Sequence, residues 1–150
     1  MQLLTIGYEG LTPDQFFGLL RANDVQTIVD VRELPLSRKT GFSKDSLAKI
    51  ARENGIKYVH IPALGCPKSI RHAYRIDKNW TRYTLRFITY LNTQDEAIAE
   101  LTSRVRQERC CLVCFEADPN YCHRLYVAER VSAETEAPLS VIHLRDSIGK

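Results

Sequence analysis

The sequence lacks the motifs that assign many small proteins to a reaction. It has no glycine-rich dinucleotide fingerprint, no phosphate-cradling glycine loop ending in lysine, and no Cys-x5-Arg loop of the phosphatase type. No apolar run is long enough to cross a bilayer. The opening residues, MQLLTIGYEG, lack the basic, apolar and small-residue order of a signal peptide. We therefore expect a cytoplasmic protein that makes no contact with membranes. The missing motifs leave its cofactors unknown.

The composition is that of an ordinary globular protein. Of the 150 residues, 44% are hydrophobic and 26% are charged, which predicts one domain over residues 1–150. The five cysteines are odd in number and do not form a disulfide-scaffold composition. They indicate reduced thiols, in keeping with a cytoplasmic location, and make disulfides the less favoured interpretation.

Strand-like and helix-like patterns alternate along almost the whole chain. Short apolar runs predict five strands, at residues 3–8, 27–32, 57–62, 110–116 and 139–144. Helical patterns follow Thr12 and Ser43 and recur at residues 80–92, 94–108 and 119–134, while residues 62–79 are expected to be irregular. This alternation predicts an α/β fold with three layers, in which a mostly parallel sheet of about five strands has helices on both faces. The strand order and the oligomeric state stay open.

Polar side chains gather where the predicted strands end. They are Tyr8, Glu9, Arg32, His60, Cys114, Glu116 and His143. In open α/β sheets, ligands bind in the crevice beyond the carboxyl ends of the strands. We therefore expect a functional site at this edge of the sheet.

The stretch CLVCFEADPNYCHR, residues 111–124, has the cysteine spacing of a zinc knuckle. Such pairs lie in turns, whereas side chains in a strand alternate between faces, so Cys111 and Cys114 should point apart. A different metal set remains as an alternative. It would combine Cys114 with Cys122 and His123, with His60 as a further candidate.

The end of this stretch carries the signals of a helix start. Asp118 can cap a helix with Pro119 at its first position, which would place Cys122, His123 and Arg124 in the first turn. Helix N-termini favour anions and lower thiol pKa values. Either Cys114 or Cys122 could then be a nucleophile, whereas the remaining cysteines are predicted to pack in the core: Cys66, Cys110 and Cys111.

Several charged groups allow two interpretations. Glu116 could pair with Arg124 or Arg32 as scaffold, or it could act as a general acid or base. Asp30 and Arg32 share one strand face and are expected to neutralise each other. The loop that Arg32 opens, RELPLSRKTGFSK, offers hydroxyl and basic groups suited to a phosphate or carboxylate ligand, among them Ser37 and Arg38.

A basic segment spans residues 66–86. It contains six basic residues and one acid, Asp77, interleaved with three aromatic side chains. Aromatic rings beside arginines can stack on the bases of single-stranded nucleic acid. However, Trp80 and Phe87 lie on one helical stripe and are predicted to belong to the core.

These motifs together resemble the bacterial and archaeal family catalogued as domain of unknown function 488. The similarity covers residues 5–143 and is most specific in two segments, DVR-x-x-P-x-S-R at residues 30–38 and C-x-E-x-x-P-x-x-C-H-R at residues 114–124. The resemblance implies a compact α/β fold and a shared polar site, without a known reaction. Carried onto this sequence, that site comprises Gly7, Asp30, Arg32, Ser37, Arg38, Tyr58, His60, Cys114, Glu116, Cys122, His123 and Arg124. The chain departs from the family pattern at Glu9 and at residues 65–67.

The leading hypothesis is a hydrolase or transferase acting on a phosphate-bearing or other anionic substrate, such as a nucleotide or nucleic acid. In it, Arg32, Arg38 and Arg124 hold the anion, and Glu116 or His60 moves protons. Cys114 or Cys122 is the nucleophile or a polar support, and the rest of the shared site contacts the substrate. Two alternatives stay open. One is a non-catalytic nucleic-acid-binding module that uses residues 66–86, and the other is a small metal-binding protein with Cys114, Cys122 and His123 as ligands.

Overall fold

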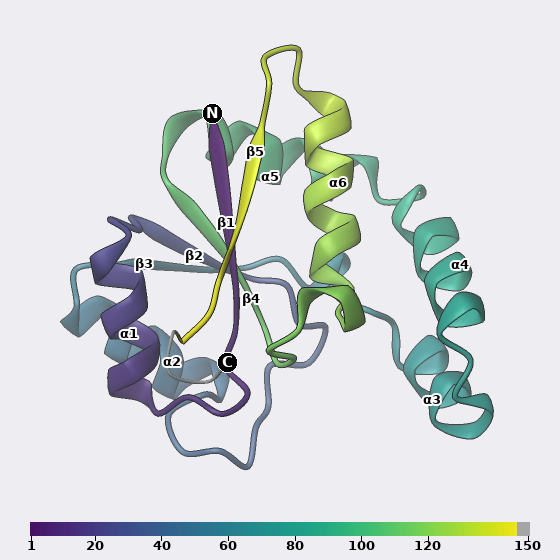
Figure 1. Ribbon diagram of the computed structural model, residues 1–150, viewed down its shortest axis with the longest axis horizontal. Helices are drawn as coiled ribbons and strands as arrows, with labels where there is room; N and C mark the ends of the chain where they lie inside the picture. Colours follow the sequence, from purple (N-terminus) through teal and green to yellow (C-terminus); the bar gives the residue numbers. More distant parts are fainter. Residues whose placement is uncertain (147–150) are drawn as a thin grey trace.

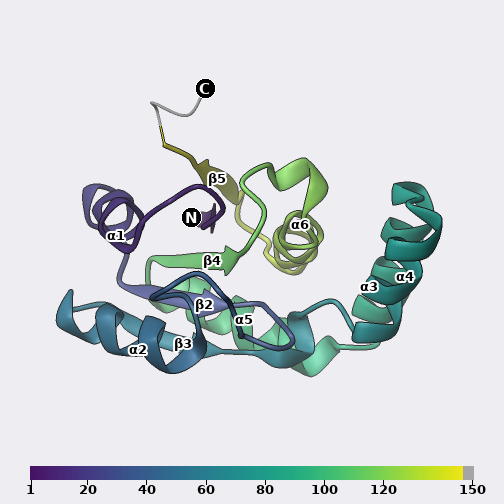
Figure 2. The ribbon, with the colours of Figure 1, turned by 90° about the horizontal axis from the view of Figure 1, so that it is seen from below.

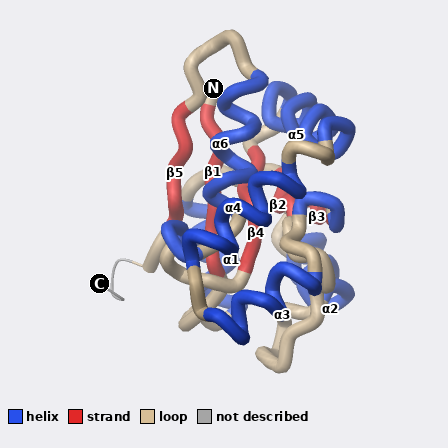
Figure 3. Tube along the Cα trace, turned by 90° about the vertical axis from the view of Figure 1, so that its right-hand side faces the viewer, coloured by secondary structure: helices blue, strands red, loops and turns tan. Residues whose placement is uncertain are grey.

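The computed structural model describes residues 1–146. Its centre is a five-stranded sheet in the order β3-β2-β4-β1-β5, in which every neighbouring pair is parallel. The strands are β1 (Gln2–Gly7), β2 (Thr27–Asp30), β3 (Lys57–His60), β4 (Cys110–Cys114) and β5 (Ser140–Leu144). They lie side by side in Figure 3, with β5 and β3 at opposite sides of the sheet. All five predicted strands are confirmed, and the strand order places β4 at the middle.

Six helices among the described residues surround the sheet. They are α1 (Pro13–Ala22), α2 (Lys44–Glu53), α3 (Lys68–Asp77), α4 (Trp80–Leu91), α5 (Asp95–Gln107) and α6 (Arg124–Glu134). Helices α1 and α2 pack on one face of the sheet, and α5 and α6 pack on the opposite face (Figure 2). The paired helices α3 and α4 extend to the side beyond α6 (Figure 1). Within residues 1–146, no helix is long and apolar enough to span a bilayer.

Alternation along the strands separates the core into two clusters, one on each face of the sheet. In β4, Cys110, Leu112 and Cys114 pack in the cluster that includes α4, α5 and α6, whereas Cys111 and Val113 pack in the cluster beneath α1 and α2. This period of two is the strand geometry that the sequence predicted. It confirms that Cys111 and Cys114 point to opposite faces, so they cannot bind one metal ion together.

The prediction that residues 62–79 are irregular is wrong. This segment contains a short 3-10 turn, Pro62–Leu64, followed by the ten-residue helix α3. No residue of α3 is fully buried, and its apolar side is limited to Ile70, Ala73 and Tyr74 among basic residues. Its contact with the core is made through partly buried side chains, Ile70 and Tyr74, which pack beside α4.

The predicted start of the last long helix is also wrong. Asp118 does cap a turn, accepting a hydrogen bond from the Asn120 amide at 3.0 Å, but that turn is the 3-10 segment Pro119–Tyr121. Cys122 then returns to an extended backbone, with φ −134° and ψ 141°. Helix α6 begins at Arg124 with His123 as its N-cap. The break directs Cys122 and His123 back towards the end of β4 instead of along a helix face.

Candidate functional site

A crevice of about 730 Å³ opens at the carboxyl ends of β1, β2 and β4. Four of the predicted site residues border it: Arg32, Cys114, Glu116 and His123. Its opposite wall comes from the 66–86 segment, through Cys66, Arg71, Tyr74, Arg75, Trp80 and Tyr83. The predicted strand-end site and the predicted basic segment are therefore two sides of one cavity.

Two thiols and an imidazole meet at this crevice. The sulfur of Cys114, at the end of β4, lies 3.6 Å from Nδ1 of His123. The sulfur of Cys122 lies 3.9 Å from the same nitrogen. All three side chains are buried, and Cys114 and His123 also line the cavity. The 3-10 turn at Pro119–Tyr121 is what returns Cys122 and His123 to the end of β4.

The orientation of His123 is set by a hydrogen bond on its far side. Its Nε2 lies 2.6 Å from the carbonyl oxygen of Val31, and because a carbonyl can only accept, Nε2 carries a proton. Nδ1 therefore faces the two sulfurs, where it can accept a thiol proton or donate to a thiolate. Phe87 packs against the ring, with centroids 5.2 Å apart and an interplanar angle of 75°.

Glu116 stands next to this group. One of its carboxylate oxygens lies 3.5 Å from the sulfur of Cys114. Burial raises the pKa of the Glu116 carboxyl to about 7, and the negative charge of Cys122 acts in the same direction. Within the described residues, no ion pair links this carboxylate to Arg32 or Arg124, the scaffold partners considered from the sequence.

The neighbouring groups shift the pKa values of the two thiols in opposite directions. The hydrogen bond to Cys122, together with burial, holds the pKa of Cys114 well above its ordinary value. Burial opposes ionisation of Cys122, but the thiol of Cys114 and the positive charges of His123 and Arg124 outweigh it and lower the pKa of Cys122. Burial likewise opposes a charge on His123, yet its contact with Cys122 raises the pKa of the imidazole. The cluster thus stabilises one thiolate opposite one imidazolium.

Asp30 and Arg32 neutralise each other, as the sequence indicated. Two guanidinium nitrogens of Arg32 donate to the two carboxylate oxygens of Asp30, each at 2.8 Å. The remaining nitrogen donates to the carbonyl of Phe42 at 2.7 Å and to the Tyr8 hydroxyl at 3.3 Å. The hydroxyl of Tyr58 donates to Asp30 at 2.5 Å. Arg32 therefore borders the crevice with its donors already engaged.

Arg124 lies inside the protein instead of at the cavity. Its side chain is completely buried, and Nε donates to Thr5 Oγ1 at 3.1 Å. Its other nitrogens donate to the backbone carbonyls of Glu116, at 2.5 Å, and Ala117, at 3.4 Å. The same loop explains Gly7, because a Cβ at that position would lie 1.7 Å from the carbonyl oxygen of Glu116. Both residues shape the loop that carries Glu116.

Three more predicted site residues lie outside the crevice lining, as do Arg124, Gly7, Asp30, Tyr58 and Cys122. Nε2 of His60 lies 2.7 Å from the backbone carbonyl of Arg32. Ser37 is held by its backbone, which exchanges two hydrogen bonds with the hydroxyl of Ser43 at 3.1 and 3.0 Å. Arg38 is exposed. The imidazole that faces the thiols is thus that of His123, not that of His60.

The sequence analysis noted three aromatic side chains in the basic segment but did not place them at the strand-end site. Trp80 and Tyr83 stack with centroids 4.5 Å apart and 14° between their planes, and Tyr74 packs edge-on against Trp80 at 5.5 Å. Tyr121 approaches Trp80 at 5.6 Å. Trp80 is only partly buried, so the prediction that it belongs to the core holds in full for Phe87 alone. The interleaving of aromatic and basic residues was the signal available for this wall.

The family model for the domain of unknown function DUF488 matches residues 12–131, which is most of the chain. The chain belongs to this family. No curated protein and no solved structure matches it. Within DUF488, the two segments that carried the resemblance now have a physical role. Residues 30–38 supply the Asp30–Arg32 pair and the carbonyl groups that orient two histidines, while residues 114–124 supply the cluster of thiol, carboxyl and imidazole groups.

Proposed function

We propose that this protein is an enzyme of the hydrolase or transferase type that acts on an anionic substrate in the crevice. One observation carries the proposal: two thiols, an imidazole and a carboxyl group lie together where β4 ends, beside a cavity of about 730 Å³. Residues that serve only packing do not need to present polar groups to a cavity. A cavity of this size lies in the usual range for small-molecule sites, about 300–1,000 Å³.

The walls support a flat substrate with negative charge, such as a nucleotide. Aromatic rings of Tyr74, Trp80 and Tyr83 provide stacking surfaces. Two arginines stand at the same wall. Arg71 forms an ion pair with Glu33, whose carboxylate lies 3.2 Å away. Arg75 has no hydrogen-bond or ion-pair partner among the described residues. Arg75 is therefore the guanidinium available to a ligand, in place of Arg32 and Arg124.

In the hydrolytic form of the proposal, Glu116 is the general base. It takes a proton from an attacking water, the water oxygen bonds to the substrate, and the proton then passes to the leaving group. The position of its carboxylate at the cavity, beside Cys114, supports this role.

A transferase is the second candidate, favoured by the 3.6 Å separation between the sulfur of Cys114 and His123 Nδ1. There, in the state with Cys122 protonated and His123 neutral, the Cys114 proton passes to Nδ1, the sulfur bonds to the substrate, and the leaving group departs with that proton. This pair is within reach of the hydrogen bond that a nucleophile and its base require. The two candidates share one substrate pocket.

A thermal-shift screen tests the proposal first. Nucleoside mono-, di- and triphosphates and inorganic phosphate are added singly, and a ligand of the native state raises the melting temperature. Turnover of each ligand that binds is then followed by chromatography. Failure of every anion to raise the melting temperature, in low salt, would argue against an anion-binding crevice.

Variants separate catalysis from binding. We expect Glu116→Gln to keep ligand binding and lose turnover by about 100-fold or more. The matched control is Glu53→Gln, an exposed carboxylate at the end of α2, which should change neither. A protein that binds single-stranded oligonucleotides with steep salt dependence and tolerates Glu116→Gln would instead be a nucleic-acid-binding module.

A further inference from the structure

The group formed by Cys114, Cys122 and His123 has the dimensions of a metal site. One ligand atom from each residue lies within 4.8 Å of the other two. Zinc binds thiolate sulfur at about 2.3 Å and imidazole nitrogen at about 2.0 Å, so a tetrahedral site places sulfur and nitrogen about 3.6 Å apart. The two observed separations, 3.6 and 3.9 Å, match that tetrahedral edge.

The surroundings of His123 fit a metal ligand. Histidines that bind metal usually donate their other ring nitrogen to a carbonyl or carboxylate, which orients the ring and fixes its tautomer. Here Nε2 is held by the Val31 carbonyl at 2.6 Å and leaves Nδ1 directed at the sulfurs. The backbone that supplies this carbonyl is itself fixed, since the Val31 amide donates to Val113 in β4 at 3.2 Å.

The supports of the two cysteines are also rigid. Cys114 is the last residue of the central strand, and Cys122 follows the 3-10 turn that Asp118 caps. Two soft thiolates and one imidazole form a donor set that favours zinc over magnesium or calcium. The divalent charge would compensate the two thiolates, which otherwise cannot both ionise in a buried site.

We propose that Cys114, Cys122 and His123 bind a Zn²⁺ ion whose fourth position faces the crevice beside Glu116. Structural zinc sites use four protein ligands, whereas catalytic sites use three and keep one position open. Cys114 and His123 line the cavity, so the open position would take a water or a substrate oxygen. This inference deepens the hydrolytic form of the proposed function, because a Cys114 thiolate bound to zinc is not the nucleophile of the transferase form. It rests on that function for the substrate at the open position, but zinc binding itself can be measured separately.

The main experiment measures metal directly. The full chain is purified without chelator, dialysed and analysed for zinc by mass spectrometry, and a chelator-stripped sample is titrated with Co²⁺. We expect about one zinc per chain and, with cobalt, the intense near-ultraviolet and visible bands of tetrahedral thiolate coordination. Less than about one-tenth of a zinc per chain after reconstitution, together with a cobalt spectrum lacking thiolate bands, would overturn the inference.

Single substitutions then assign the ligands. Cys114→Ser, Cys122→Ser and His123→Ala should each lower zinc affinity by more than the roughly 100-fold that loss of a supporting group costs. Cys66→Ser is the matched control, because its thiol borders the same crevice but lies outside the three-ligand group. A Cys66→Ser protein that loses zinc while Cys122→Ser keeps it would contradict the assignment. Should a ligand variant fail to fold, the cobalt spectrum of the unaltered chain still decides the thiolate coordination.

The metal and the enzyme proposals fail in different ways. Glu116→Gln should retain one zinc per chain, since Glu116 is outside the ligand group, and should lose turnover. A zinc-loaded protein that binds no anion in the thermal-shift screen supports the metal site and removes the proposed function. Turnover by a zinc-free protein that is unaffected by chelator removes the role of the open metal position in turnover and leaves the enzyme proposal standing.

Discussion

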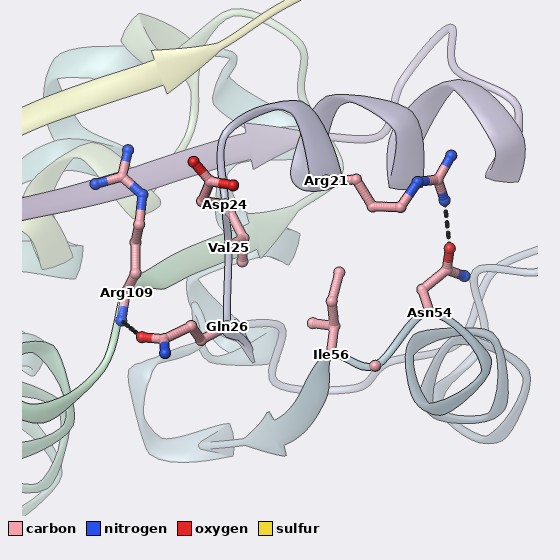
Figure 4. Close-up of a pocket in the computed structure, with 8 residues that line it drawn as sticks. Arg21, Asp24, Val25, Gln26, Asn54, Ile56 and Arg109 are labelled. Atoms are coloured by element: carbon pink, nitrogen blue, oxygen red, sulfur yellow. Dashed lines mark hydrogen bonds between the residues drawn. The ribbon is translucent and has the colours of Figure 1, made fainter.

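The two edges of the sheet carry cavities of opposite character. At the amino edge, a cavity of about 530 Å³ is lined by residues that include Arg21, Gln26, Asn54 and Arg109. Its polar groups bond to one another: Arg21 donates to Asn54, and the Arg109 amide donates to Gln26 at 2.7 Å (Figure 4). At the carboxyl edge, the thiol of Cys114 and the imidazole of His123 instead line the cavity, and the buried sulfur of Cys122 lies 3.9 Å from His123 Nδ1. Among the described residues, thiol and imidazole groups line the cavity at the carboxyl edge and none lines the cavity at the amino edge.

Loop length explains the difference. At the amino edge, residues 23–26 join α1 to β2 and residues 54–56 join α2 to β3, helped by left-handed backbone at Asp24 (φ 56°) and Gly55 (φ 70°). At the carboxyl edge, residues 31–43 follow β2, residues 61–79 follow β3 with α3 inside them, and residues 115–123 follow β4. Long segments leave room for a crevice and for side chains from distant parts of the chain.

The largest expected effect on stability is at Gly7, at the carboxyl edge, and a matched glycine at the amino edge, Gly55, serves as its control. Gly7→Ala would push a Cβ to 1.7 Å from the Glu116 carbonyl, a clash with backbone that cannot rotate away. We expect a loss of about 4 kcal/mol or more of unfolding free energy, or no folded protein. Gly55→Ala meets no atom within 4 Å and should cost only about 1 kcal/mol, from its positive φ.

Urea unfolding of both alanine variants checks this contrast. Equal and small losses would mean that the loop after β4 moves easily, and then the packing at the carboxyl edge would not be what positions Glu116.

Breaking the buried ion pair beside the crevice should have the next largest effect. Asp30→Asn leaves Arg32 charged, almost fully buried and without its carboxylate, which typically costs about 3 kcal/mol. Tyr58→Phe keeps the pair and removes one hydrogen bond, so it should cost about 1 kcal/mol. Thermal and urea unfolding measure both. A stable Asp30→Asn protein with impaired ligand binding would restore Asp30 to the substrate-contact role first predicted.

The sequence predicted the elements and the edge better than the contacts within the site. Strand alternation alone separated Cys111 from Cys114, because the period of two does not depend on tertiary structure. By contrast, Asp118 and Pro119 carry the same start signal for a 3-10 turn as for an α-helix. Only the extended backbone at Cys122 distinguishes them, and that conformation depends on packing against β4.

The sequence also did not indicate which arginines are buried or which groups they bond to. Arg124 looked like an anion ligand because its motif contains reactive residues, yet its partners are Thr5 and two carbonyls. Arg75 looked like one of six similar basic residues, and only the placement of α3 puts it at the crevice. An arginine can therefore hold a buried loop, as Arg124 does, or border a cavity, as Arg75 does. Which of these it does depends on contacts with residues distant in the sequence.

A moderate effect on binding should distinguish the two halves of the basic segment. Arg75→Ala removes the unshared guanidinium of the crevice and should weaken binding of a nucleoside monophosphate about fivefold, near 1 kcal/mol. Arg82→Ala is the matched control, because Arg82 is 62% exposed and lies 3.9 Å from Asp77, outside the crevice lining. Titration calorimetry at two salt concentrations measures both. Equal weakening would place the anion on the outer surface of α3 and α4.

The smallest effect is expected at the amino edge. Arg21→Ala removes an exposed side chain that bonds to Asn54, and exposed substitutions of this kind stay within about 0.5 kcal/mol. Urea unfolding should show that small change, while zinc content and the melting-temperature shift with nucleotides stay as in the unaltered chain. The result matters because Arg21 borders a cavity of about 530 Å³, compared with about 730 Å³ for the crevice. If its loss abolished zinc or ligand binding, cavity size would count for more than the directed thiol and imidazole groups, and the contrast between the two edges would no longer locate the site.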